Sequence, residues 1–295
     1  MELPTGFLET TAHGFYIVTR PVYHKLALSL AERDPERVLS EGAPPGAPAP
    51  LQGRGPWIEL RGEGADTIIL KKQRRGGLYA RLRGDIHRDD YRAVSEVFLS
   101  ETAWKKGVPV ALTAFALSGP AGEGRMASYR RGYCASIKLP GARSLMDWLS
   151  SPATTQTERR LVMTAAAQAV SRAHDRGFQH ADLNLGNILV VRSEQGDYTG
   201  WLIDLAGSRL GGTLRFKPRL ENLARLYRSA EKWMPAAPGD VGRRRFRQVV
   251  FFLRAYTARE RGMARRYLEA AGRYRASLLI HRLGWRLSRP AIPER

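Results

Sequence analysis

Three polar side chains near the middle of the sequence have the types and spacing of a metal–nucleotide site. Asp182 and Asn187 lie in the stretch HADLNLGNIL, and Asp204 ends the apolar stretch WLID. A polar turn separates two apolar runs, 188–191 and 201–204, so we expect a hairpin that brings the three side chains to one end of a sheet. One carboxylate that can accept a proton, beside an amide and a second carboxylate with hard oxygens, suits a magnesium-bound nucleotide.

The same pattern, H-x-D-x-x-x-x-N followed by a strand that ends in Asp, is typical of the catalytic core of the protein-kinase fold. A single HxD occurs by chance in many proteins, and Asp and Asn favour loops because they satisfy turns locally. The combination of motif, strand, turn and second strand is more specific than any of its parts. It predicts a phosphotransferase.

The composition is that of a folded chain in a reducing compartment. The 295 residues, 43% hydrophobic and 9% aromatic, suffice for one bilobal domain or two ordinary ones. Cys134 is the single cysteine, which excludes a disulfide framework and a cysteine-rich metal site. The first residues, MELPTGFLET, lack a signal-peptide pattern, and no uncharged apolar run reaches a membrane-spanning length. We therefore expect a cytosolic protein.

The formal net charge of +20 implies a polyanionic partner, which charge alone leaves open between nucleic acid, an anionic lipid surface and a phosphorylated substrate. The segment 243–289 holds fourteen arginines and two glutamates. Apolar residues recur there at helical spacing, at Phe246, Val249, Val250, Leu253 and Tyr256. Such a basic amphipathic helix suits an anionic membrane surface or a nucleic-acid backbone, although an apolar stripe is more often part of a core.

The first part of the chain has mainly strand signals. Apolar runs bounded by turn residues predict strands at 13–20, 57–60, 67–72, 110–117 and 125–139, and helical spacing predicts helices at about 25–39 and 89–106. Gly53 and Gly55 could let backbone amides approach a phosphate. The full GxGxxG is not present, however, and most glycine pairs are ordinary hairpin turns.

A lysine and a glutamate in this part could complete a nucleotide site. Lys71 ends an apolar strand, from which it could reach the α- and β-phosphates. Lys72 points to the opposite face by strand alternation, so only one of the two can serve, and we favour Lys71 over the alternative of a solvated strand lysine. In a kinase fold, Glu96 on the following helix would pair with this lysine and hold it on the phosphates.

The second part is predicted to be mainly helical, with helices at 144–149 and 222–233 and a loop at 211–218. A capping box, T-x-x-E, starts a long Ala-rich helix at Thr155, which ends at Gly177.

Together these elements predict an α+β, bilobal protein-kinase-like fold with the site in the cleft between lobes. A β-rich N-lobe would span 1–140 and a mainly helical C-lobe 141–235, followed by a basic helical C-terminal extension at 236–295.

Five stretches together resemble the lipopolysaccharide core kinases and, within that family, the kinases of 3-deoxy-D-manno-octulosonic acid (Kdo). They are RRGG (74–77), GVPV (107–110), HADLNLGNIL (180–189), WLIDL (201–205) and ENLARLYRSAEK (221–232). The resemblance covers about residues 50–235. It implies a kinase that uses ATP and Mg²⁺ to phosphorylate the Kdo sugar on lipid A, as a peripheral protein at the cytoplasmic face of the inner membrane.

Carried over to this sequence, the resemblance implies roles for the five polar residues. Asp182 would be the catalytic base that accepts the proton of the sugar hydroxyl. Asn187 and Asp204 would hold Mg²⁺. Lys71 would contact the phosphates, and Glu96 would orient it.

The departures from the kinase pattern bear on the acceptor. Ala181 replaces the arginine of HRD, and Leu205-Ala206 replaces the rest of DFG, so we expect neither regulation by loop phosphorylation nor a protein substrate. The second departure also leaves the exact sugar open. The positive charge fits Kdo–lipid A or a related anionic glycolipid in an anionic leaflet.

Two alternatives remain at this point. The acceptor could be a core heptose or a small soluble molecule, or the chain could be an inactive kinase-like binder of nucleic acid or an anionic surface. Aromatic residues do interleave with arginines in the tail, as base stacking would need. The complete set of Lys, Glu, Asp, Asn and Asp favours an active kinase and argues against nucleic acid. Arg74, Arg75 and the 211–219 loop are candidates for contacting the acceptor.

Overall fold

The computed structural model of the chain describes residues 5–42, 57–62, 66–73, 86, 90–122, 124–233, 241–258, 260 and 262–273. The chain forms two compact units. Unit 1 comprises Met1–Ala142 and Trp201–Gly211, and unit 2 comprises Arg143–Gly200 and Gly212–Arg295.

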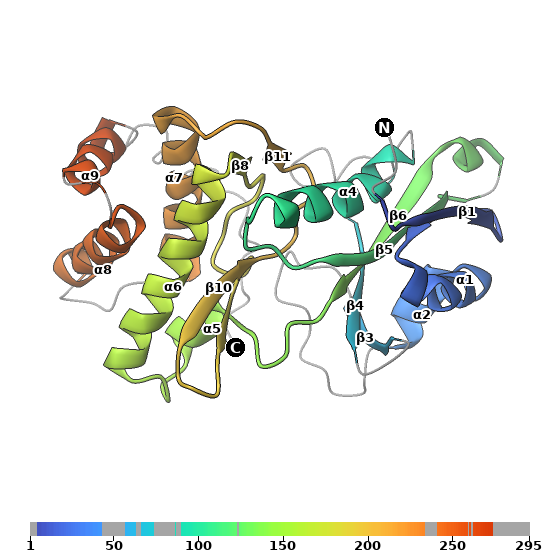
Figure 1. The fold of residues 1–295 in the computed structure, drawn as a ribbon, viewed down its shortest axis with the longest axis horizontal. Helices are drawn as coiled ribbons and strands as arrows, with labels where there is room; N and C mark the ends of the chain where they lie inside the picture. Colours follow the sequence, from blue (N-terminus) through green and yellow to red (C-terminus); the bar gives the residue numbers. More distant parts are fainter. Residues whose placement is uncertain are drawn as a thin grey trace, which may run out of the picture. The chain divides into compact units, whose positions relative to one another are not determined.

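Unit 1 is built on a six-stranded antiparallel sheet with the order β1-β2-β5-β6-β4-β3 (Figure 1). The strands are β1 (Leu8–Ala12), β2 (Phe15–Thr19), β3 (Trp57–Arg61), β4 (Thr67–Lys72), β5 (Thr113–Pro120) and β6 (Arg130–Ile137). Strand β2 is shorter than the strand predicted at 13–20, because His13 and Gly14, with φ of 52° and 79°, form the turn between β1 and β2. Two central residues with positive φ match the twist of a tight hairpin.

Helices cover both faces of this sheet. On one face lie α1 (His24–Glu32) and α2 (Pro35–Glu41), packed on buried side chains that include Ile68 and Leu70 of β4. On the other face α4 (Tyr91–Lys105) places Val94 and Val97 against Val18 and Ala116. Figure 1 shows α4 and the α1–α2 pair on opposite sides of the strands.

The single helix predicted at 25–39 is wrong, because the chain breaks between α1 and α2. Asp34 has φ of 56°, and its side chain accepts a hydrogen bond from the N–H of Glu36 at 3.0 Å. Pro35 lacks an N–H and disfavours a helical conformation in the residue before it. Proline is tolerated in a first helical turn, so Asp34 caps a new helix instead.

Unit 2 is mainly helical. Its helices are α5 (Leu145–Ser150), α6 (Gln156–Asp175), α7 (Phe216–Trp233), α8 (Val241–Tyr256) and α9 (Met263–Arg273). The short strands β7 (Arg143–Ser144) and β9 (Ile188–Arg192) join β10 (Tyr198–Leu202) in a three-stranded sheet, and β8 (Phe178–Gln179) follows α6. In unit 1, β11 (Arg209–Leu210) completes the strands of the described chain.

The ends of α6 agree with the sequence signals, and the start of α7 does not. Thr155 and Glu158 form the predicted capping box, and Gly177 has φ of 81° just beyond the helix. α7 begins at Phe216 inside the predicted loop. Pro218 falls in its first turn, where no intrahelical N–H bond is lost, and so starts the helix rather than preventing it.

The C-terminal helices pack on this core, α8 against α6 and α9 against α7 and α8. Figure 1 shows them at one side of the α6–α7 pair, at the left of the view. Within the part of the chain that the structure describes, no helix is both long and apolar enough to cross a bilayer.

Candidate active site

Strand β4 sends its two terminal lysines to opposite faces of the unit 1 sheet. Ile68 and Leu70 face the core under α1 and α2. By the two-residue period of a strand, Lys72 shares that face and Lys71 points to the face that α4 covers. The partners of the two lysines follow this division.

Lys71 pairs with two carboxylates. Its Nζ lies 3.2 Å from Oε1 of Glu96 on α4 and 2.8 Å from Oδ1 of Asp204. Burial disfavours the lysine charge, but the attraction of both carboxylates outweighs it and raises the pKa of Lys71 above its usual value. A permanently charged lysine beside a partly exposed carboxylate is suited to bind a phosphate.

Glu96 is the buried anchor of this cluster, with a side chain 2% exposed. Besides Lys71, it accepts hydrogen bonds from Gln73 Nε2 at 3.3 Å and from the main-chain N–H of Leu205 at 3.2 Å. It therefore ties β4 and α4 to the segment that carries Asp204. Asp204 has φ of 61°, a left-handed conformation that Asp tolerates better than most residues, and its side chain is 48% exposed.

Lys72 has a different set of partners on the other face. Its Nζ lies 2.8 Å from Oε2 of Glu36 at the start of α2, and the Tyr133 hydroxyl donates to the same oxygen at 2.6 Å. Burial disfavours the charge of Glu36, but these two bonds outweigh it and lower the pKa of its carboxyl. Lys72 thus fastens α2 to the sheet.

Asp182 and Asn187 lie in unit 2, in the loop 180–187, which we call the catalytic loop. Asn187 Nδ2 donates to the main-chain oxygen of Asp182 at 3.0 Å, so its Oδ1 is not used by this bond. Asn184 Nδ2 donates to Oδ2 of Asp182 at 3.0 Å, and Asn184 Oδ1 accepts from the N–H groups of Gly186 and Asn187 at 2.9 and 3.1 Å. The loop is thus held by its own asparagines.

Three side chains of α7 form hydrogen bonds to the main chain of this loop. Asn222 brackets His180, accepting from its N–H and donating to its carbonyl, each at 3.0 Å. Arg225 donates to the carbonyl of Ala181, and the Ser229 hydroxyl accepts from the N–H of Leu185 at 3.2 Å. Residues at i, i+3 and i+7 share one helix face, which gives a physical reason for the spacing in NLARLYRS.

The kinase motifs in the sequence assign no role to these three α7 residues. Their spacing was a usable signal, but their partners lie more than forty positions earlier in the chain, at His180, Ala181 and Leu185. Nothing local in the sequence identifies those partners.

His174, at the end of α6, supports Asn222. Its Nε2 lies 3.3 Å from Asn222 Oδ1, and the residue is 1% exposed. Burial lowers the pKa of His174 from 6.5 to about 3, so the imidazole is neutral at physiological pH.

The structure therefore brings Lys71, Glu96 and Asp204 together in unit 1, and Asp182 and Asn187 together in unit 2. That the two sets form one nucleotide site stays a prediction. Gly53, Gly55, Arg74 and Arg75 lie outside the described residues.

The donor set fits Mg²⁺ in chemical type, because Asp204 and Asn187 offer a carboxylate and an amide oxygen. The described residues contain no group of three or more His, Cys, Asp or Glu side chains placed to hold a metal. Mg²⁺ is usually held by one or two carboxylates together with substrate phosphates, so a sparse protein donor set is the expected form.

A family model described as "Lipopolysaccharide kinase (Kdo/WaaP) family" matches residues 54–256. A 3-deoxy-D-manno-octulosonic acid kinase from Haemophilus influenzae (strain PittEE) is 28% identical over 61% of this chain and 73% of its own length. The enzyme of the same name from Photobacterium damsela subsp. piscicida is 31% identical, over 60% and 70%. That from Xylella fastidiosa (strain 9a5c) is 33% identical, over 56% and 62%.

Among solved structures, one titled "WaaP in complex with acyl carrier protein" matches with a TM-score of 0.50 and 20% identity, over 92% of this chain and 99% of that one. This likeness confirms the predicted α+β, kinase-like fold.

We predict that the two neighbouring lysines differ in function. Lys71→Ala should lower kcat/KM for ATP by on the order of 100-fold, because a charge-neutralising group at the phosphates is lost. Lys72→Ala should keep transfer activity and lower only the free energy of unfolding, by about 1 kcal/mol. Steady-state kinetics and urea unfolding on both variants make the comparison, and equal activity of the two would contradict it.

The pH dependence of stability should report the buried His174. Its folded-state pKa lies below the usual one, so between pH 6.5 and about 3 the unfolded chain binds a proton that the folded chain does not. Stability is therefore lost as pH falls through that window. The stability advantage of the wild type over His174→Gln should shrink by about 1.4 kcal/mol between pH 7.5 and 5.5. Urea unfolding at both pH values measures it, and a pH-independent difference would count against a neutral buried imidazole.

Proposed function

Because the chain belongs to the lipopolysaccharide kinase (Kdo/WaaP) family and is therefore a kinase, we propose that it transfers the γ-phosphoryl group of ATP to a hydroxyl of Kdo on lipid A. The observation that carries the proposal is the Lys71–Glu96–Asp204 cluster, in a chain whose curated relatives are named Kdo kinases. Phosphoryl transfer needs mainly positioning and charge neutralisation, which such a cluster supplies.

In this proposal each residue has one task. Lys71 neutralises phosphate oxygens, and Glu96 keeps its ammonium group in place. Asp182 accepts the proton of the attacking hydroxyl as the new oxygen–phosphorus bond forms and the bond from the γ-phosphorus to ADP breaks, while Asn184 orients its carboxylate. Bound Mg²⁺ would neutralise the remaining phosphate charge, with Asn187 and Asp204 as its protein ligands.

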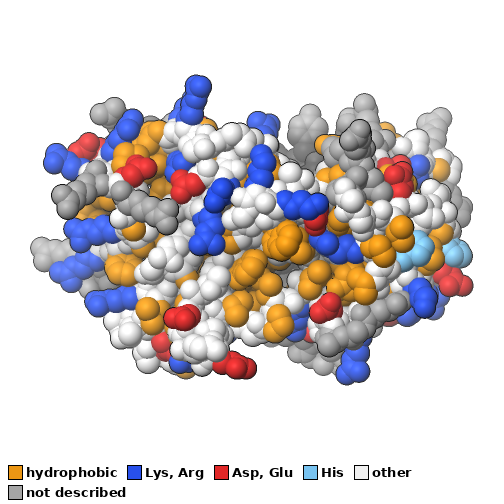
Figure 2. Space-filling model, in the orientation of Figure 1, with side chains coloured by type: hydrophobic (Ala, Val, Ile, Leu, Met, Phe, Trp, Pro, Cys, Tyr) orange, Lys and Arg blue, Asp and Glu red, His pale blue; other side chains and the backbone are white. Residues whose placement is uncertain are grey.

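The charge distribution supports an anionic glycolipid as acceptor. Arg247 and Arg254 of α8 and Arg265 and Arg266 of α9 are exposed, and Phe246 beside them is 58% exposed. Figure 2 shows Lys and Arg side chains over this part of the surface, at the left of the view. Basic residues near an anionic leaflet contribute about 1 kcal/mol each. We therefore propose a peripheral location at the cytoplasmic face of the inner membrane.

Mass spectrometry of acceptors after incubation with the protein, ATP and Mg²⁺ tests the proposal. We expect one added phosphate on Kdo–lipid A in detergent micelles. A heptosylated lipid A core and a soluble aminoglycoside serve as competing acceptors. Phosphate on the heptose alone would move the acceptor within the core, and phosphate on the aminoglycoside alone would exclude a lipid acceptor.

Asp182→Asn should separate chemistry from nucleotide binding. The amide cannot accept a proton, so we expect kcat to fall by about 10² to 10⁴-fold while the Kd for ATP stays close to the wild-type value. Single-turnover assays and fluorescence titration with a nucleotide analogue measure the two quantities. Asp197→Asn, in the exposed turn before β10, is the matched control and should leave both unchanged. Full activity of Asp182→Asn would show that another group is the base.

A further inference from the structure

The C-terminal helix α8 ends in a buried tyrosine that reaches the end of α6. Tyr256 is 4% exposed, and its hydroxyl oxygen lies 2.7 Å from His174 Nδ1. His174 contacts Asn222, whose amide brackets the main chain of His180. We propose that Tyr256 is a positioning residue, through which α8 holds the catalytic loop in its active arrangement.

The donor and acceptor in each hydrogen bond from Tyr256 to His180 follow from the orientation of the Asn222 amide. Its Oδ1 accepts from the His180 N–H and its Nδ2 donates to the His180 carbonyl, and the reversed amide would satisfy neither. Since Oδ1 carries no proton, His174 Nε2 must donate to it. A neutral imidazole has one N–H, so His174 Nδ1 is an acceptor and the Tyr256 hydroxyl is its donor.

Tyr256 is itself held by groups from α7 and α9. The guanidinium of Arg219 and the hydroxyl of Tyr267 lie next to its hydroxyl. The rings of Tyr256 and Tyr267 meet edge to face with centroids 5.6 Å apart, and Tyr267 stacks on Phe216 at 4.6 Å. Arg219 is fixed in turn by Asp175 at 2.8 Å. The hydroxyl therefore has a defined position before it meets the imidazole.

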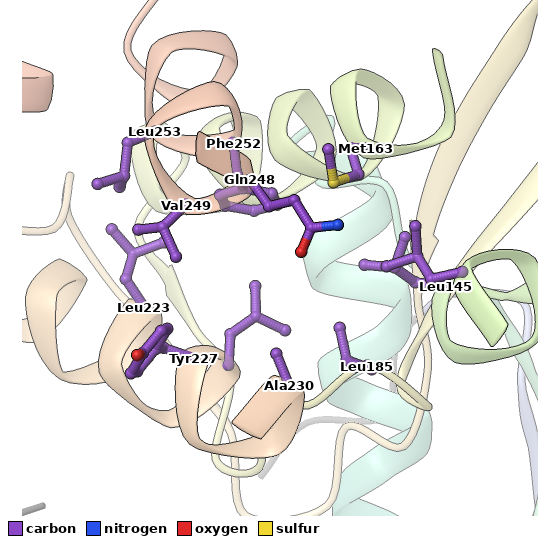
Figure 3. A pocket seen from close by; sticks show the side chains of 12 residues that line it. Leu145, Met163, Leu185, Leu223, Tyr227, Ala230, Gln248, Val249, Phe252 and Leu253 are labelled. Carbon is purple, nitrogen blue, oxygen red and sulfur yellow. The ribbon is translucent and has the colours of Figure 1, made fainter. Parts of the chain in front are cut away.

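The hydrogen bond between Tyr256 and His174 adds to the apolar packing of α8 on the other helices of unit 2. A cavity of about 120 Å³, lined mainly by apolar side chains, lies among α5, α6, α7 and α8. Figure 3 shows Val249 of α8 and Leu223 of α7 at the left of it, and Met163 of α6 and Leu145 of α5 at the right. α8 packs on α6 outside this pocket, but dispersion contacts are reduced across it. The hydrogen bond at the end of α8 adds a directional constraint that apolar packing does not supply.

The consequence for activity rests on the proposed role of Asp182 as base. Without the Tyr256 hydroxyl, buried His174 Nδ1 loses its donor, and the other tautomer would set the Nε2 lone pair against Oδ1 of Asn222. The first state leaves a buried acceptor unpaired, and the second removes the hydrogen bond from His174 to Asn222. Exchange between the two weakens the support of Asn222, although its two bonds to His180 remain. Asp182 follows His180 by two residues, so its carboxylate would be held less precisely than transfer requires.

Tyr256→Phe in the full chain tests this through hydrogen exchange and through kinetics with ATP and Kdo–lipid A. We expect peptides from the catalytic loop to exchange roughly five- to ten-fold faster. We expect kcat to fall roughly ten- to hundred-fold, with the KM for ATP unchanged. Tyr23→Phe is the matched control, since Tyr23 is 2% exposed and its hydroxyl donates to Asp66 at 2.7 Å in unit 1. It should change neither quantity.

A double-mutant cycle with Asn222→Ser distinguishes positioning from general destabilisation. If Tyr256 acts through Asn222, Tyr256→Phe lowers kcat no further in the Asn222→Ser background. If Tyr256→Phe does not fold, His174→Gln interrupts the same series of hydrogen bonds. It must then give the same faster loop exchange and the same loss of kcat. The positioning role would be overturned if the variant that folds has the loop exchange rate and the kcat of the wild type. It would also be overturned if the two substitutions lower kcat additively in the cycle. Hydrogen exchange is measured without a phosphate acceptor. If the variant changes loop exchange but even the wild type does not phosphorylate Kdo, the proposed acceptor is wrong and the positioning role stands.

Discussion

Unit 1 depends on a carboxylate buried where it cannot be solvated by water. Glu96 is 2% exposed, and an unpaired charge in that position would cost several kcal/mol. Lys71, Gln73 and the N–H of Leu205 all bond to it. The same three bonds fix the lysine, the strand that carries it and the start of the segment after Asp204. Compensation of one charge therefore determines the geometry of half of the proposed site.

Unit 2 meets a different constraint, because an irregular loop must satisfy its main-chain polar groups without a ladder of its own. The catalytic loop does this with its own Asn184 and with side chains of α7, chiefly Asn222 and Ser229. Each of these bonds is neutral and directional. Apart from the bond that Arg225 donates to the Ala181 carbonyl, the loop is thus held by neutral hydrogen bonds, whereas the cluster around Glu96 is held by charge.

Local signals predicted some regular elements closely and others only in part, since the strands predicted at 110–117 and 125–139 are β5 at 113–120 and β6 at 130–137. Strand β4 agrees with its prediction because turn residues in the sequence precede a short apolar run with two isoleucines, and α6 agrees because its capping box and Gly177 mark both ends. The break at Asp34 and the early start of α7 at Phe216 both involve proline in a first turn, where it permits a helix that a simple rule would end. Alternation also showed that Lys71 and Lys72 must differ, but their partners come from helices distant in the sequence.

The contrast between the two units has a chemical reason if they serve one reaction. A metal-bound triphosphate brings a large negative charge, and every carboxylate added near it would repel it and compete for the metal. Lys71 meets that charge with its own. Beneath the catalytic loop, an amide at Asn222 and an imidazole kept neutral by burial at His174 support the main chain without placing a further charge beside Asp182. Of the three α7 side chains that hold the loop, Arg225 alone carries a charge, and that charge is positive, so none of the three adds a negative charge that would repel a phosphate.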